Sequence, residues 1–161
     1  MTRVQEVVGF LEIIAGVWGT VMGITFVSKV SGLLLLLPLT VILLFTFFGI
    51  AGLLLYRGHP LGRPLSIVSQ VIQVPVFITS WGGYYCVGGA GLRLTIPLDS
   101  NGYLGWYVHL GSQLHLSWAA ESDATTIGVN AVAVALLVAL LLNRHKAATG
   151  VTSPASIGGA A

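Results

Sequence analysis

The stretch 33–56 reads "LLLLLPLTVILLFTFFGIAGLLLY" and contains no charged residue. A helix needs about 20 apolar residues to cross the hydrocarbon core of a bilayer, and this stretch is long enough. The whole chain of 161 residues is 55% hydrophobic and only 7% charged, whereas an ordinary soluble domain is about 25% charged. The sequence therefore predicts an integral membrane protein. The net charge of +2 is too small to indicate a nucleic-acid partner.

Three further stretches are apolar enough to be spans, namely 7–27, 65–81 and 126–142. With 33–56 they predict four transmembrane helices in a single membrane domain, residues 1–146. The remaining residues, 147–161, are small and polar, and we expect a flexible cytoplasmic tail there.

The placement of lysine and arginine predicts the topology, because cytoplasmic loops carry an excess of both residues. With the N-terminus inside, the cytoplasmic side holds most of the basic residues, which are Arg3, Arg57, Arg63, Arg144 and Lys146. The outer side then holds only Lys29 and Arg93. We expect a protein of a bacterial cytoplasmic membrane with both termini in the cytoplasm and residues 82–124 exported.

The exported segment contains three stretches in which apolar and polar residues alternate, "LRLTIPL" (92–98), "LGWYVHL" (104–110) and "LHLSW" (114–118). A period of two is typical of strands with one buried face. The breaks "DSNG" and "GS" are typical of turns. The sequence therefore predicts a mainly α membrane protein with a three-stranded antiparallel β-meander between helices three and four. Its apolar face is expected to cover the helix bundle or to pair with another subunit.

The apolar pattern also predicts the register, because a slip of one residue would move every side chain to the opposite face. It pairs Trp106 with Trp118 and Ile96 with Trp106, and it sets His109 opposite His115 with Arg93 next to His109. An arginine beside two imidazoles suits an anionic ligand such as a phosphate, a carboxylate or a lipid headgroup. Two alternatives stay open: a metal site at His109 and His115, or merely the wet surface of the sheet.

The first predicted helix carries one acid, Glu12, on a face rich in small residues. Gly16, Gly19 and Gly23 share that face, as does Gly9, and such a stripe marks helix packing. The third predicted helix carries polar residues at similar spacing, namely Ser66, Ser69, Gln70 and Gln73. Glu12 and Gln70 lie at matching depth, so we expect an intramembrane polar contact of Glu12 with Ser66, Gln70 and Gln73. This contact is either a structural link between helices or an ion, proton or ligand site.

The stretches "GFLEIIAGVWG" and "LSIVSQVIQVPVF" resemble those of small bacterial four-helix membrane proteins with a Glu-bearing, Gly-rich first helix. That group has no assigned activity. The resemblance implies the four-helix architecture and implies no chemistry.

No Ser/His/Asp order, HExxH, GxSxG or nucleotide-binding loop occurs in the sequence, which argues against an enzyme. The exported acids Asp99, Glu121 and Asp123 fit solvated turns, and the single cysteine, Cys86, fits a small buried residue better than an intermolecular disulfide. The sequence favours a non-enzymatic binding, structural or accessory protein that uses its sheet and glycine face, with no cofactor. Its expected partners are the lipid bilayer and a second copy or another membrane protein. The alternative is an oligomeric pore or small transporter that uses Glu12, Gln70 and Gln73.

Overall fold

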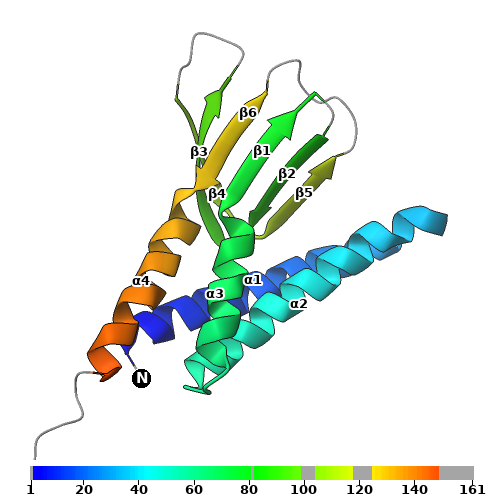
Figure 1. Cartoon of the computed structure of the whole chain (residues 1–161). Coiled ribbons are helices and arrows are strands. Elements are labelled where there is room, and N and C mark those ends of the chain that lie inside the picture. The colour runs from blue at the N-terminus through cyan, green and yellow to red at the C-terminus, as the bar shows by residue number, and fades with distance from the viewer. Residues whose placement is uncertain (1, 81, 99–103, 118–124, 149–161) are drawn as a thin grey trace, which may run out of the picture.

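The computed structural model describes residues 2–80, 82–98, 104–117 and 125–148. It contains four α-helices, a short 3-10 helix and six strands (Figure 1). In chain order they are α1 (Arg3–Val27), η1 (Gly32–Leu35), α2 (Leu36–Tyr56), α3 (Gly62–Gln73), β1 (Pro75–Thr79), β2 (Gly82–Val87), β3 (Ala90–Pro97), β4 (Gly105–Leu110), β5 (Gln113–Ser117), β6 (Thr126–Asn130) and α4 (Ala131–Ala148).

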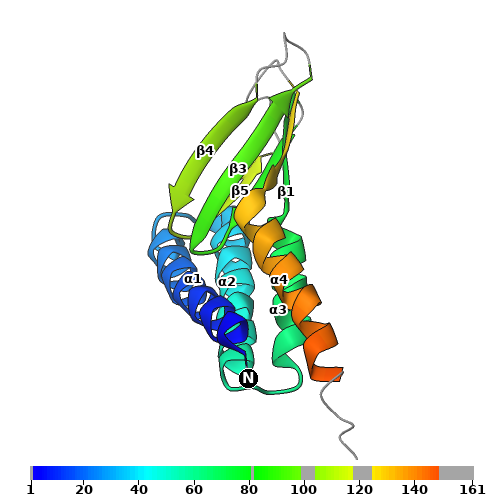
Figure 2. The ribbon, with the colours of Figure 1, turned by 90° about the vertical axis from the view of Figure 1, so that its left-hand side faces the viewer.

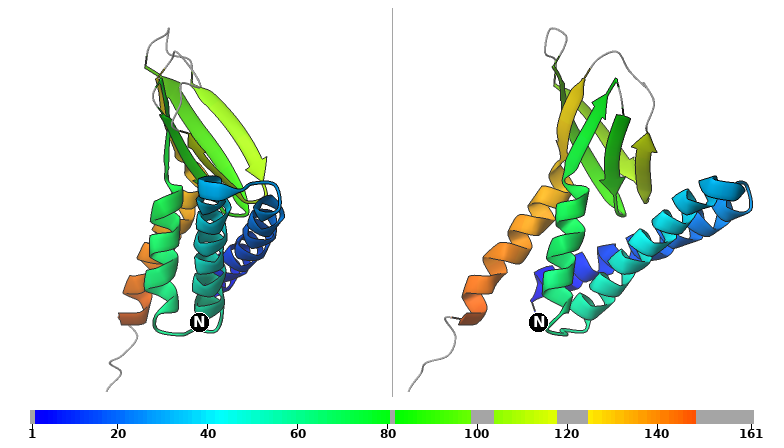
Figure 3. Two further views of the ribbon diagram at one scale, coloured as in Figure 1. Left: turned by 90° about the vertical axis from the view of Figure 1, so that its right-hand side faces the viewer. Right: turned by 45° about the vertical axis from the view of Figure 1, so that its right-hand side comes forward.

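Helices α1 and α2 form a hairpin whose tip leads away from α3 and α4 (Figures 1 and 3). The helices approach closely because α1 presents glycines to α2. A Cβ atom at Gly16 would lie 2.4 Å from the Gly49 Cα atom, and one at Gly19 would lie 2.1 Å from the Phe45 ring. Gly23 faces Ile42 in the same way. The glycine stripe therefore packs against α2, while α3 meets the neighbouring part of α1.

The expected four-helix membrane bundle is wrong. Only α1 and the stretch Gly32–Tyr56 are long and apolar enough to cross a membrane, among the residues that the structure describes. The apolar part of α4, Ala131–Leu142, is shorter. The most apolar part of Gly32–Tyr56 is only 17% buried, unlike the core helix of a soluble protein.

The predicted third and fourth spans fail because each contains a strand. Helix α3 ends at Gln73 because Pro75 has no N–H to donate, and the next residues, "VFIT", are β-branched or aromatic. In the predicted fourth span, 126–142, the chain first forms β6 and only then enters α4. Asn130 caps α4, since its side-chain oxygen accepts from the Ala133 N–H at 3.4 Å. A continuous apolar run does not distinguish a buried strand from a helix.

The predicted three-stranded meander is also wrong, because the six strands form one antiparallel sheet in the order β4-β3-β6-β1-β2-β5. Strands β3 and β4 pair as expected, but Trp106 pairs with Leu94 rather than with Ile96. Strand β5 pairs with β2 and not with β4, so His115 is opposite Tyr85 and His109 is opposite Gly91. The expected pairing of Trp106 with Trp118 involves a residue outside the described ones.

The sheet curls into a half-barrel, and Figure 2 shows β3 and β4 in front of β5 and β1. Two strands separate β3 from β2, which would put them about 14 Å apart in a flat sheet. The Arg93 guanidinium nevertheless lies 4.1 Å from the centre of the Tyr85 ring. Gly111, with φ of 109°, lies in the connection from β4 to β5. The curl explains the failed register, because the short Gly111–Ser112 link joins the two edges of the half-barrel and is not a hairpin turn.

The two faces of the half-barrel differ in polarity. Pairing places the polar side chains on the concave face, including Arg93, Tyr107, His109, Tyr85, Gln113, His115 and Asn130. The convex face is apolar. Its β2 and β5 part packs on α2 through Cys86 and Leu114, but Trp106, Val108 and Ile127 are exposed. The expectation that the apolar face covers the helices therefore holds for only one part of the sheet.

The α1–α2 contact yields a matched test at Gly16 and Gly49. A methyl group at Gly16 overlaps the backbone of α2, and such overpacking costs about 1–3 kcal/mol. A methyl group at Gly49 would lie 3.5 Å from its nearest neighbour, which is an ordinary contact. Alanine is also more favourable than glycine in a helix by about 1 kcal/mol. Gly16→Ala should lower the melting temperature in detergent, measured by circular dichroism, and Gly49→Ala should leave it equal or higher. Equal losses in both variants would contradict this packing.

Candidate functional site

Arg93 of β3 reaches across the concave face, and its guanidinium contacts two aromatic rings. Its guanidinium lies 4.1 Å from the Tyr85 ring centre and 5.3 Å from that of Tyr107. Tyr85 in turn stacks on His115, with ring centres 4.7 Å apart and planes 7° from parallel. The Gln113 side-chain amide donates to the Tyr85 hydroxyl at 2.9 Å. Ring faces attract a cation without neutralising it, so Arg93 keeps its charge available.

Asn130 is directly opposite Arg93 across the β3–β6 pair, and its side chain is completely buried. Its oxygen accepts from the backbone N–H groups of Leu92 at 3.3 Å and Ala133 at 3.4 Å. These two bonds occupy the amide oxygen and leave the amide nitrogen, Nδ2, without an acceptor in the described part of the chain. Asn130 Nδ2 and Arg93 Nε are both buried, and neither has an acceptor among the described residues.

Two adjacent donors without acceptors need an acceptor-rich group, because buried polar atoms are nearly always hydrogen-bonded. No side chain on the described part of this face supplies a carboxylate. Of the five acidic residues in the sequence, only Glu6 and Glu12 lie among the described residues, and both belong to α1. The concave face is therefore suited to an anion. Gly91 lies close beside this pair, since a Cβ atom there would lie 3.4 Å from Asn130 Nδ2 and would overlap the Val87 side chain at 2.8 Å.

The structure places Arg93, His109 and His115 on the same concave face but not in one row. Tyr107 stands opposite Arg93, and the two histidines belong to opposite edge strands. Within the described ranges, no three His, Cys, Asp or Glu side chains gather where a metal ion could bind. Sequence reasoning did not place Tyr85 or Asn130 beside Arg93, although an asparagine before an apolar helix is a capping signal.

The second polar cluster joins α1 to α3. The Ser66 hydroxyl donates to Glu12 Oε2 at 2.5 Å, and the Gln70 amide donates to Glu12 Oε1 at 2.8 Å. All three side chains are at most 2% exposed. The structure thus brings Glu12 together with Ser66 and Gln70, and both carboxylate oxygens are occupied.

Gln73 lies one turn further along α3 and contacts the sheet rather than Glu12. Its side-chain oxygen accepts from the Gly88 N–H at 2.7 Å, and its amide donates to the Ser69 carbonyl at 3.2 Å. On the other side, the Ser112 hydroxyl donates to the Ala15 carbonyl at 2.7 Å. These bonds fix the base of the half-barrel on α1 and α3.

Cys86 is a buried structural residue. Its side chain packs against Phe45 and Phe48, and burial raises the pKa of its thiol to about 12. A protonated, inaccessible thiol is inert.

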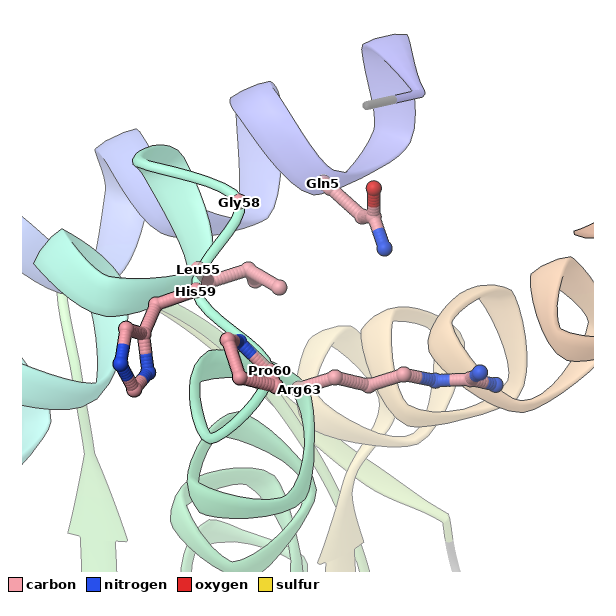
Figure 4. A pocket seen from close by; sticks show the side chains of 6 residues that line it. All are labelled: Gln5, Leu55, Gly58, His59, Pro60 and Arg63. Atoms are coloured by element: carbon pink, nitrogen blue, oxygen red, sulfur yellow. The ribbon is translucent and has the colours of Figure 1, made fainter.

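A small pocket of about 240 Å³ lies at the opposite end of the molecule, between the start of α1 and the turn before α3 (Figure 4). Arg63 extends from it toward α4, where its guanidinium donates to the Leu140 carbonyl at 2.6 Å. His59 accepts from the Leu61 N–H at 3.2 Å. The polar groups of this pocket therefore tie α3 to α4 and stabilise the turn.

No protein-family model, no curated protein and no solved structure matches this chain. The resemblance to small four-helix membrane proteins therefore stays an expectation, and the four-helix architecture that it implies is corrected by the fold.

The Glu12 cluster yields a second test. Glu12→Gln keeps one acceptor for Gln70 and gains a donor toward Ser66, so it should be tolerated within about 1 kcal/mol. Glu12→Leu leaves two buried groups without a partner, each costing about 1–3 kcal/mol. We expect thermal unfolding in detergent to show a clear loss for Glu12→Leu alone. Equal melting temperatures in the two variants would exclude a stabilising role of the cluster.

Proposed function

We propose that this protein is a small, non-enzymatic binding protein that is anchored in a bilayer by the α1–α2 hairpin and that binds an anionic ligand on the concave face of its half-barrel. The main observation that supports this proposal is the pair of adjacent buried donors, Arg93 Nε and Asn130 Nδ2, which have no acceptor among the described residues. Charge-assisted hydrogen bonds from such donors suit a phosphate or carboxylate.

Membrane anchoring is supported by an inverted distribution of polarity. In α3 the polar side chains Ser66, Ser69 and Gln70 are buried, while Val68 and Val71 are exposed. The half-barrel repeats the pattern, with polar groups inside and apolar groups such as Trp106 outside. Large exposed apolar surfaces mark contact with a membrane or a partner, and a polar interior within an apolar exterior suits lipid surroundings.

A binding role accounts for the site better than catalysis does. The described concave face has a fixed cation and donors but no carboxylate that would serve as a general acid or base. The His115 ring stacks on Tyr85, and the Cys86 thiol points away from the concave face, toward α2. These contacts support recognition of a charged group without chemistry on it.

The alternative, an oligomeric pore or transporter built around Glu12, has one supporting observation. The buried Gln70 Oε1 atom has no donor among the described residues. Against it, both Glu12 oxygens accept hydrogen bonds, so an ion would have to displace Ser66 or Gln70. The geometry favours the binding role.

The donor pair yields a test with inorganic phosphate as the probe, by calorimetry at constant ionic strength. A hydrogen bond to a charged group contributes about 1.5–3 kcal/mol, so Arg93→Gln should weaken binding by about tenfold or more. Asn130→Asp keeps the acceptor that caps α4 but replaces the donor with a carboxylate oxygen, and it should also weaken binding. Lys29→Gln removes a positive charge elsewhere and serves as the control. If all three variants bind phosphate as the parent does, the proposed site is wrong.

The expected topology is tested with an impermeant maleimide on intact cells. The parent chain should stay unlabelled, because Cys86 is buried and its pKa is about 12. Leu98→Cys lies at the far end of the sheet and should be labelled, while Leu61→Cys in the α2–α3 turn should be labelled only after lysis. The reverse pattern would invert the proposed orientation.

A further inference from the structure

A groove of about 710 Å³ separates the α1–α2 hairpin from the connection between β4 and β5. One wall consists of apolar side chains of the hairpin, including Trp18, Met22 and Leu37. The other wall includes Leu114 and Leu116 of β5. This volume lies within the range of about 300–1,000 Å³ that is usual for ligand sites.

One part of the groove is polar, because His109 and Gln113 also line it. Gln113 donates to the Tyr85 hydroxyl at 2.9 Å, and the Arg93 guanidinium lies on the same Tyr85 ring. His109 is two residues from Tyr107, the other ring that Arg93 contacts. His109 and Gln113 thus lie beside the two rings that Arg93 contacts, on the same concave face.

We infer that the groove receives an acyl chain of a membrane lipid whose anionic headgroup binds at Arg93 and Asn130. This inference rests on the proposed function and names its ligand class. Two observations select this occupant. The first is charge complementarity, since the concave face next to the groove has an unneutralised guanidinium, two buried donors and no described carboxylate.

The second observation is the opening of the groove. Trp18, Met22 and Leu37 are all about half exposed, and they continue the apolar surface that the hairpin presents to its surroundings. An acyl chain from the bilayer therefore reaches the groove sideways, without crossing a polar surface. The groove holds the chain while the concave face holds the headgroup.

The test uses fluorescence quenching of Trp18 in detergent. Trp81, Trp106 and Trp118 are replaced by phenylalanine, and the protein is titrated with phosphatidylglycerol or phosphatidylcholine brominated on the acyl chains. We expect saturable quenching near one lipid per protein, with the anionic lipid binding about tenfold or more tightly. Arg93→Gln should abolish this preference while quenching by both lipids persists.

The groove itself is tested with two neighbouring substitutions. Leu37→Phe narrows the groove and should reduce saturable quenching by both lipids about tenfold, whereas Leu36→Phe, on the adjacent residue that does not line the groove, should bind as the parent does. Equal binding by these two variants would overturn the acyl-chain site, and phosphate binding that still depends on Arg93 would leave the proposed function standing. If lipid binding depends on the groove but shows no preference for the anionic headgroup, the headgroup assignment is wrong. If phosphate also fails to bind, the proposed function is wrong as well.

Discussion

The hydrogen bonds of the Glu12 carboxylate with Ser66 and Gln70 link the two halves of this molecule. The glycine face of α1 is used by α2, and α3 packs against α2 so closely that a Cβ atom at Gly62 would overlap the Leu55 backbone. The Glu12 contact adds a buried polar link between α1 and α3 to this apolar packing. Apolar packing between helices in lipid has little hydrophobic driving force, because lipid tails are as apolar as leucine. A buried carboxylate with two partners, in contrast, specifies one orientation. Since α3 leads directly into β1, that orientation also sets the position of the sheet.

The curl of the sheet is the second constraint, and the concave site depends on it. Arg93, Tyr85 and Asn130 come from three different strands, β3, β2 and β6. In a flat sheet the first two would be too far apart to touch, whereas the half-barrel brings the guanidinium to 4.1 Å from the ring. Gly91 contributes to the curl, because a Cβ atom there would overlap Val87 at 2.8 Å. The same curl that collects polar groups inside turns Trp106 and Val108 outward.

Local patterns in the sequence predicted local features and failed for long-range ones. Alternation in 92–98, 104–110 and 114–118 identified three strands and the polarity of their faces, because a strand reverses its side chains at every residue. The spacing of Glu12 and the glycines indicated the contact faces of α1. Strands β1 and β6 were missed because they lie inside apolar runs that also fit helices. Strand neighbours were missed because the loop Gly111–Ser112 has hairpin chemistry but crosses between sheet edges, and only tertiary packing decides between the two.

The acyl chain and the headgroup of the proposed lipid contribute differently to its binding. An acyl chain that moves from the bilayer into an apolar groove exchanges one apolar environment for another and gains little free energy, although the same chain leaving water would gain about 0.8 kcal/mol per methylene group. Selectivity must therefore come from the headgroup. Arg93 is well placed for this purpose, because its Nε atom is buried and Tyr85 and Tyr107 contact the guanidinium without neutralising it. Electrostatic attraction increases as the local dielectric constant falls. Binding at a half-buried guanidinium is also less screened by salt than binding at a surface lysine. A lipid-binding site of this kind would recognise charge strongly and chain structure weakly.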